Sequence, residues 1–207
     1  MFISFEGLDF SGKSTQVSLL KNYLEENKQT VYLIREPGGT AISEKIRQLL
    51  LDRKNFEMHS ETELLLFYSS RAQLIREVIR PKLKEGVFVL SDRFHDSSTA
   101  YQGYGRGLDL DFIGSLNKFV LGETVPDLTF FIDVSLSEIE KRKKLNSEIE
   151  LDRIESSNDE FYRRVRNGYL KLSETEERFK LIDGNRSINS IFEEILVILK
   201  KHPKFRG

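Results

Sequence analysis

The chain has 207 residues, 39% of them hydrophobic and 31% charged, which is typical of a single globular domain. Its 32 basic and 33 acidic residues give a formal net charge of -1, which argues against a protein that holds nucleic acid by bulk electrostatics. The lack of cysteine excludes disulfides and thiolate chemistry, and three scattered histidines disfavour a zinc site. No apolar run approaches the roughly 20 residues of a membrane span, and no signal segment precedes the first strand, so we expect a cytoplasmic protein without a membrane partner.

The chain begins with an apolar strand, a glycine-bounded loop and a helix. The loop Gly7–Ser14 matches G-x-x-x-x-G-K-[ST] at every fixed position. The glycines let backbone N–H groups turn inward around a phosphate, and the following helix directs its positive dipole end at the same point. We therefore predict a nucleoside triphosphate site in which Lys13 reaches the β- and γ-phosphates and Ser14 binds Mg²⁺. The alternative is a strand-to-helix turn that binds nothing. The predicted site comprises Gly7, Leu8, Asp9, Phe10, Ser11, Gly12, Lys13, Ser14 and Thr15.

Strand and helix patterns alternate along the rest of the chain. After a strand over 2–5, we expect strands over 30–34, 87–90, 128–134 and 179–182, and helices over 13–27, 41–51, 60–84, 109–121, 161–176 and 188–201. A further helix starts near Leu136, and Pro81 is expected to interrupt the third helix. The glycine-rich stretch Ser97–Gly107 is expected to be a binding loop, and the polar region around 142–157 a lid. The alternation predicts one α/β domain, 1–207, with a five-stranded parallel sheet flanked by helices on both faces.

Asp92 and Arg93 directly follow the apolar strand over 87–90 and Ser91. Ligands of open α/β sheets collect at the carboxyl ends of the strands, which brings this pair to the edge that carries the phosphate loop. A carboxylate there can hold Mg²⁺ through water, and an arginine can grip a phosphate with two donors. The alternative is an ordinary ion pair at a strand end.

A phosphate loop alone does not separate kinases from GTPases or motor ATPases. The segment Asn117–Val120 lacks the aspartate of the guanine-binding N-K-x-D motif and lies within a predicted helix, which disfavours a GTPase. The chain has no length for the additional modules of a motor. A small kinase needs an acceptor pocket, a lid that excludes water and extra cations near the transferring phosphoryl group, and the chain has candidates for each.

Several motifs then carry a family resemblance in matching order over nearly the whole chain: Phe5–Gly7 before the loop, Arg35–Thr40, Phe67–Arg71, Asp92–Phe94, Ala100–Gly107 and Leu151–Glu155. Together they resemble the thymidylate kinase family. The resemblance implies a P-loop fold of the nucleotide-monophosphate-kinase type. It also implies transfer of the γ-phosphoryl group of ATP to dTMP, giving dTDP and ADP in dTTP biosynthesis, with Mg²⁺ as cofactor and a homodimer as the assembly.

The resemblance also assigns roles to individual residues. Phe67 would stack on thymine, and Arg71, four residues later on the same helix face, would hydrogen-bond a base carbonyl. Without the family match, a core phenylalanine beside a surface arginine would be preferred. The other acceptor residues implied are Asp9 near the sugar and the phosphate-binding arginine, Arg93 on the acceptor phosphate with Arg47 as helper, Ser97 and Gln102 at the base edge, Tyr101 near the sugar, and Arg35 and Pro37.

One departure concerns the catalytic cation. Some family members have an arginine in the phosphate loop where this chain has Phe10; others, commonly bacterial, supply the cation from the lid. Because this chain has Phe10, the resemblance implies that the lid supplies the catalytic cation. Arg153 aligns with the lid motif of the family, whereas the roles of Arg142 and Lys144 stay open. Two other hypotheses stay open: a related deoxynucleoside or nucleotide kinase of the same fold, and a nucleotide-binding regulator without turnover. Intact Lys13 and Arg93 speak against the regulator.

Overall fold

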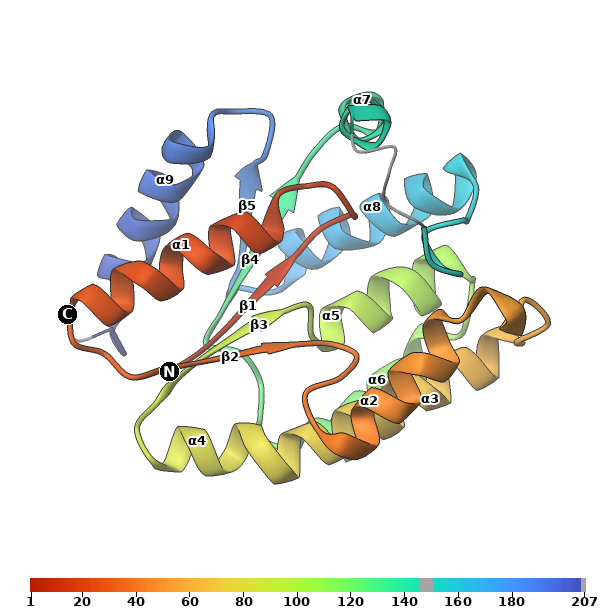
Figure 1. Ribbon diagram of the computed structural model, residues 1–207, viewed down its shortest axis with the longest axis horizontal. Coiled ribbons are helices and arrows are strands. Elements are labelled where there is room, and N and C mark those ends of the chain that lie inside the picture. Colours follow the sequence, from red (N-terminus) through yellow and green to blue (C-terminus); the bar gives the residue numbers. More distant parts are fainter. Residues whose placement is uncertain (146–150, 206–207) are drawn as a thin grey trace.

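The protein forms a central sheet between two layers of helices, as the computed structural model of residues 1–145 and 151–205 shows (Figure 1). The strands lie in the order β2-β3-β1-β4-β5, and each neighbouring pair is parallel. The predicted five-stranded parallel sheet is thus confirmed. The strands are β1 (Phe2–Glu6), β2 (Val31–Arg35), β3 (Phe88–Asp92), β4 (Leu128–Asp133) and β5 (Phe179–Asp183).

The helices begin and end close to the predicted positions, and α2 has the predicted bounds. Side-chain caps explain several of the starts: Thr40, Asp109, Asn158 and Ser187 each accept a hydrogen bond from the backbone N–H three residues later. The helices are α1 (Lys13–Glu26), α2 (Ala41–Leu51), α3 (Ser60–Leu74), α4 (Arg80–Lys84), α5 (His95–Ser98), α6 (Leu110–Leu121), α7 (Leu136–Leu145), α8 (Asp159–Thr175) and α9 (Ile188–Lys201). No helix in the described ranges is long and apolar enough to cross a bilayer.

Apolar side chains cover both faces of the sheet. On one face α1 and α9 pack against alternate residues of β1 and β4, including Ile3 and Phe5. On the opposite face, Phe2 and Val89 contact α3 and α6, and Phe131 packs under α8. Burial on both faces explains why the central strands are continuously apolar in sequence.

Two predictions of local structure need correction. The helix after Ser60 does not break at Pro81; instead, a π-helical turn at Ile75–Ile79 joins α3 to α4, because this wider turn accommodates the ring and the missing N–H of the proline. The expected binding loop within Ser97–Gly107 is mostly helical, with a π-helical segment at Thr99–Gly105 after α5.

The parallel strands bring their carboxyl ends to one edge. Phe5 pairs with Asp92 across β1 and β3, so the loop after β1 and the residues after β3 start side by side. The region expected to be the lid, around 142–157, begins in the last turn of α7 and ends just before α8; its residues 146–150 lie outside the described residues.

Candidate active site

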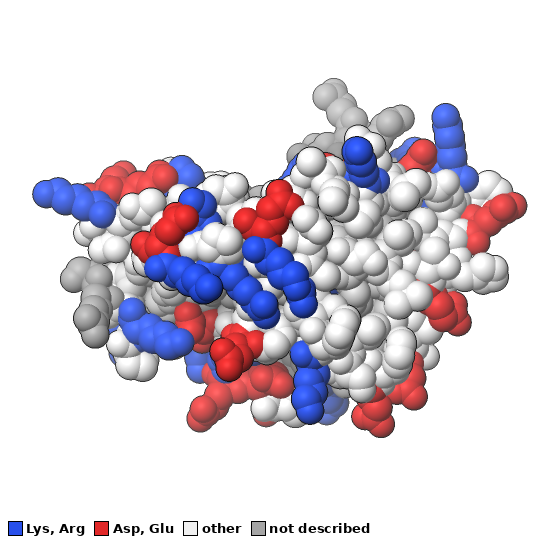
Figure 2. Space-filling model, turned by 90° about the horizontal axis from the view of Figure 1, so that it is seen from below, with Lys and Arg blue, Asp and Glu red and all other residues white. Residues whose placement is uncertain are grey.

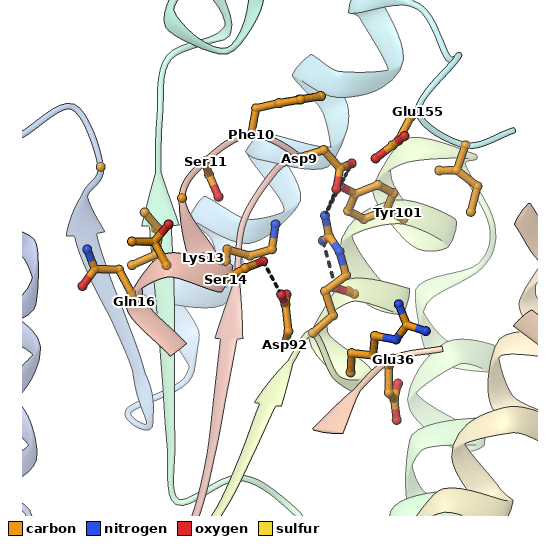
Figure 3. Close-up of a pocket in the computed structure, with 18 of the residues that line it drawn as sticks. Asp9, Phe10, Ser11, Lys13, Ser14, Gln16, Glu36, Asp92, Tyr101 and Glu155 are labelled. Carbon is orange, nitrogen blue, oxygen red and sulfur yellow. Dashed lines mark hydrogen bonds and ion pairs between the residues drawn. The ribbon is translucent and has the colours of Figure 1, made fainter. Parts of the chain in front are cut away.

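A cavity of about 920 Å³ opens at the carboxyl ends of the strands. Figure 3 shows the phosphate loop on one side of it, with Tyr101 directly beside Asp9; the Tyr101 hydroxyl donates to the Asp9 carboxylate at 3.3 Å. The cavity collects residues from distant parts of the sequence. Those predicted for the site that line it are Asp9, Phe10, Ser11, Gly12, Lys13, Ser14, Thr15, Arg35, Pro37, Arg47, Phe67, Asp92, Arg93, Ser97, Tyr101, Gln102 and Arg142.

The phosphate loop has the backbone that an anion nest needs. Gly12, at the start of α1, has φ 94°, a conformation that L side chains rarely adopt. Gly7 has φ 143°, and a Cβ there would lie 2.6 Å from the carbonyl oxygen of Ile132. Gly7 and Leu8 are not among the described residues that line the cavity. Both glycines thus hold a backbone with positive φ, and Gly7 in addition allows the loop to approach β4 closely.

Lys13 lies beneath the loop. Its ammonium group donates a hydrogen bond to the carbonyl oxygen of Leu8 at 2.8 Å. Burial, together with the nearby Arg93 cation, lowers the pKa of Lys13. A polyphosphate on the loop would supply the negative charge that compensates this buried cation.

Ser14 and Asp92 provide oxygen atoms of the kind that Mg²⁺ prefers. The hydroxyl of Ser14 donates to the carboxylate of Asp92 at 2.6 Å (Figure 3). Within the described ranges, no cluster of three or more His, Cys, Asp or Glu side chains forms a closed metal cage. This donor set fits Mg²⁺, which keeps several waters and takes its remaining ligands from one or two side chains and from substrate phosphates.

Arg93 lines the cavity and is held in place by a dense set of contacts. Its guanidinium forms an ion pair with Asp9 at 2.6 Å and donates to the hydroxyl of Tyr101 at 3.1 Å. Burial alone would lower the pKa of Arg93, but Asp9 and the neighbouring tyrosine oxygens raise it well above its usual value. Arg93 has φ 68°, which is strained for a residue with a long side chain. The guanidinium is therefore a fixed, permanent cation.

Glu6 supports this arginine from below and was not among the predicted site residues. Its buried carboxylate accepts hydrogen bonds from the hydroxyls of Ser97 at 2.6 Å and Tyr169 at 2.9 Å. The same two hydroxyl oxygens accept from Arg93 at 3.3 and 3.2 Å. Burial, and repulsion from Asp96, raise the pKa of Glu6 to about 7. The Glu6–Gly7 pair at the start of the phosphate loop is the feature of the sequence that could have identified Glu6 as a site residue.

The far end of the cavity has an aromatic wall. Phe67 of α3 is partly buried against the cluster that contains Tyr101 and Leu8. Gln102 lies beside them, and its amide nitrogen donates to the carboxylate of Glu63 at 2.9 Å. A flat apolar ring next to an oriented amide is an arrangement that can bind a heterocyclic base.

Arg71 does not line the cavity in the described structure, although Phe67 on the same helix face does. Its guanidinium, 1% exposed, forms an ion pair with Glu36 at 2.7 Å and donates to the hydroxyl of Ser98 at 3.0 Å. Glu36 and Ser98 themselves line the cavity, so Arg71 lies directly behind its wall.

Arg35, Pro37 and Arg47 form the outer rim beside β2. Arg47 donates to the carbonyl oxygen of Pro37 at 2.8 Å. Burial, and the nearby Arg35 cation, lower the pKa of Arg47. The exposed Arg35 forms a longer ion pair with Glu44, at 3.6 Å. The rim is thus basic and faces the same space as Arg93.

The two predicted lid arginines lie in different surroundings. Arg142 of α7 lines the cavity and donates to the carbonyl oxygens of Ser11 at 3.1 Å and Gly184 at 2.9 Å. Arg153 is directed away: it forms an ion pair with Glu63 at 2.7 Å and donates to the carbonyl oxygen of Leu50 at 2.8 Å. Its neighbours Asp152, Ile154 and Glu155 do line the cavity.

The comparisons with known proteins agree on one family. The thymidylate kinase family model matches residues 5–195. A thymidylate kinase of Thermosipho africanus is 49% identical, with 98% of each chain covered, and one of Kosmotoga olearia is 50% identical over 97% of this chain and 98% of that protein. The crystal structure of thymidylate kinase from Ehrlichia chaffeensis superposes with a TM-score of 0.78 at 38% identity, covering 97% of this chain and 98% of that one. The chain therefore belongs to the thymidylate kinase family.

Proposed function

We propose that the cavity binds ATP on the phosphate loop and dTMP between Arg93 and Phe67. The family phosphorylates dTMP to dTDP with ATP in dTTP synthesis, and as a member this chain is an ATP-dependent kinase. The observation that carries the assignment of sites is that one cavity is lined both by Lys13 of the phosphate loop and by Arg93, whose guanidinium is fixed by its ion pair with Asp9. Each of the two substrates carries a phosphate that needs a cation.

On the donor side, the loop N–H groups and Lys13 hold the ATP phosphates, and Ser14 and Asp92 are the residues that would hold Mg²⁺. When bound by these residues, Mg²⁺ would supply positive charge that offsets the negative charge developing on the phosphate oxygens. The oxygen-only donor pair supports this assignment.

On the acceptor side, Arg93 orients the dTMP phosphate so that one of its oxygens attacks the γ-phosphorus. The new P–O bond forms as the bond from the γ-phosphorus to the bridging oxygen of ADP breaks. No general base is needed, because the attacking oxygen is already anionic, and positioning supplies much of the rate enhancement. The ion pair of Arg93 with Asp9 supports this role, since it fixes the guanidinium before substrate binds.

The region around 142–157 is proposed to be a lid within a single domain, supplying cations to the transferring phosphoryl group. Arg142 is supported by its contact with the loop carbonyl of Ser11. Arg153 is supported by its place in the matched stretch Leu151–Glu155, and its present ion pair with Glu63 requires it to move before it can act.

The assembly is proposed to be a homodimer formed through α2, α3 and α6. Figure 2 shows that the face seen from below has a wide area nearly free of charged side chains on its right. These three helices form that part of the molecule in Figure 1, and α3 packs against the other two. They expose large apolar side chains at i, i+7 positions, which share a helix face: Ile42 and Leu49 on α2, and Phe112 and Phe119 on α6.

The function is tested by coupled ADP release from ATP and Mg²⁺ with a panel of dTMP, dUMP, ribo-TMP, dCMP, AMP, CMP and GMP. Turnover that is fastest with dTMP is the expected result. Preference for another acceptor would reject the assignment of the base pocket, and tight ATP binding without any turnover would favour a regulatory protein. We further propose a cytoplasmic location, where ATP is available.

A further inference from the structure

Three side chains converge on the buried carboxylate of Glu63, one helical turn before Phe67 on α3. Arg106 donates to both of its oxygens, at 3.2 and 3.1 Å, and Arg153 forms an ion pair with it at 2.7 Å. The amide of Gln102 completes the set at 2.9 Å. Glu63 is 1% exposed, so its contacts are with protein groups.

The chemistry of this cluster fixes the orientation of the Gln102 amide. An ionised carboxylate only accepts hydrogen bonds, so the atom of Gln102 that faces Glu63 must be the NH₂ group. Burial alone would raise the pKa of Glu63, but the hydrogen bonds and charge of Arg106 lower it, which keeps the carboxylate ionised at neutral pH. The nitrogen and oxygen of an amide diverge from the same carbon. Placing the nitrogen on Glu63 therefore turns the oxygen away from it, and Gln102 lines the cavity.

We propose that Glu63 is a positioning residue for base specificity: it holds Gln102 with its oxygen toward the cavity, where that oxygen accepts a hydrogen bond from a base that carries N–H at ring position 3. Thymine and uracil have this N–H. In cytosine the ring nitrogen at this position carries no hydrogen and is a hydrogen-bond acceptor. It would face the amide oxygen, which is also an acceptor, so no hydrogen bond could form. The inference rests on the proposed function and extends it to a residue that does not line the cavity.

The test is the variant Glu63→Gln, assayed with dTMP, dUMP and dCMP. A glutamine at this position can donate as well as accept, so Gln102 is free to rotate its amide. We expect the ratio of kcat/KM for dTMP over dCMP to fall about tenfold, the size of effect typical of one hydrogen bond. The ratio of dTMP over dUMP should stay unchanged, because both bases carry the N–H.

Two controls separate positioning from support of the fold. Glu61→Gln makes the same chemical change at an exposed position of the same helix and should leave all three substrates unaffected. In a Gln102→Ala background, Glu63→Gln should no longer alter the ratio of dTMP over dCMP, because the amide that it orients is gone. Equal losses for all three substrates, or an unchanged effect in the Gln102→Ala background, would overturn the role of Glu63.

A measurement on the wild-type protein covers the case in which loss of the buried charge prevents folding. N3-methyl-dTMP lacks the N–H, so it should bind at least tenfold more weakly than dTMP. Equal binding would reject the proposed hydrogen bond while leaving the kinase function intact. A wild-type protein that phosphorylates dCMP in preference to dTMP would overturn both the proposed function and the role of Glu63.

Discussion

Arg142 donates a hydrogen bond from its guanidinium to the carbonyl oxygen of Ser11 at 3.1 Å, which joins α7 to the phosphate loop. Because the loop is where the ATP phosphates are proposed to bind, this arginine is already at the donor side of the cavity. A second contact, with the carboxylate of Glu138 at 3.2 Å, comes from one turn earlier in the same helix.

The first prediction is that Arg142→Ala lowers kcat roughly hundredfold, because one preorganised donor to the developing charge is lost. The KM for dTMP should change little, since the acceptor is bound elsewhere. Steady-state kinetics with both substrates varied measure the two effects. Lys141→Ala is the matched control, because this neighbour is 73% exposed and pairs only weakly with Glu138 at 3.6 Å. An unaltered kcat in Arg142→Ala would remove Arg142 from the mechanism.

The second prediction concerns Arg153. If it leaves Glu63 and joins the phosphoryl group during turnover, Arg153→Ala lowers kcat much more than it weakens dTMP binding. Single-turnover kinetics together with dTMP titration measure the two quantities. Weaker dTMP binding at unchanged kcat would instead indicate that Arg153 stays on Glu63 and serves the base pocket.

The third prediction is a pH dependence of stability from Glu6. Its pKa is about 7 in the folded protein and 4.5 is its ordinary value, so the native state holds the proton more tightly than the unfolded chain. The stabilisation from Glu6 is therefore full below about pH 4.5 and is lost as the pH rises through 7. Glutamine does not ionise. The free energy of unfolding of wild type, measured relative to Glu6→Gln, should fall by about 3 kcal/mol over this window.

Urea unfolding of both proteins at several pH values between 4.5 and 8 measures this difference. Taking the difference removes the contributions that both proteins share, such as that of buried His95, whose pKa burial lowers to about 3. A difference independent of pH would show that Glu6 keeps an ordinary pKa.

The fourth prediction is a loss of stability in Arg178→Ala. Arg178 donates to both carboxylate oxygens of the buried Asp96, each at 2.8 Å. Removing it leaves a buried charge unpaired, which should lower the free energy of unfolding by about 3 kcal/mol. Arg186→Ala breaks the exposed pair with Glu194 and should cost less than about 1 kcal/mol. Similar losses in the two variants would contradict the special cost of the buried pair.

The fifth prediction tests the dimer. Phe119 is 78% exposed on α6, and Phe119→Glu places a charge in the proposed apolar interface. Sedimentation equilibrium should show a dimer for wild type and a monomer for the variant. Val197→Glu, at an exposed apolar position of α9 on the other face of the sheet, should remain dimeric. A wild-type monomer would reject the assembly.

Local patterns in the sequence were sufficient for most of the fold. The phosphate loop and α2 depend on short-range spacing and caps, and both were predicted with their bounds. The glycines and paired aromatics of Ser97–Gly107 predict a binding loop, but the backbone over Thr99–Gly105 is helical. A Cβ on Gly103 would lie 2.5 Å from Leu110, and one on Gly105 would lie 2.6 Å from Phe161. These glycines allow close packing of helices, which depends on neighbours that the local sequence does not reveal.

The same limit applies to the site. Spacing placed Phe67 and Arg71 on one helix face, but Arg71 finds its partner Glu36 on a segment 35 residues away. Glu36 competes for the guanidinium that the sequence assigned to a base. The left-handed backbone of Arg93 and the support from Glu6 are also tertiary features, since they depend on contacts between β1 and the turn after β3.

Phe5 pairs with Asp92 across β1 and β3. This pairing separates the part of the site proposed for phosphoryl transfer from the part proposed for base recognition. The groups proposed to hold the donor and acceptor phosphates, the phosphate loop and Arg93, directly follow the neighbouring strands β1 and β3, so the spacing of the sheet would set the gap that the phosphoryl group crosses. The residues proposed to contact the base, Phe67 and Gln102, come instead from α3 and the helical segment after α5, outside the sheet. Substitutions on one face of α3 could therefore change which base is accepted during evolution, while the distance between the donor and acceptor phosphates stays the same.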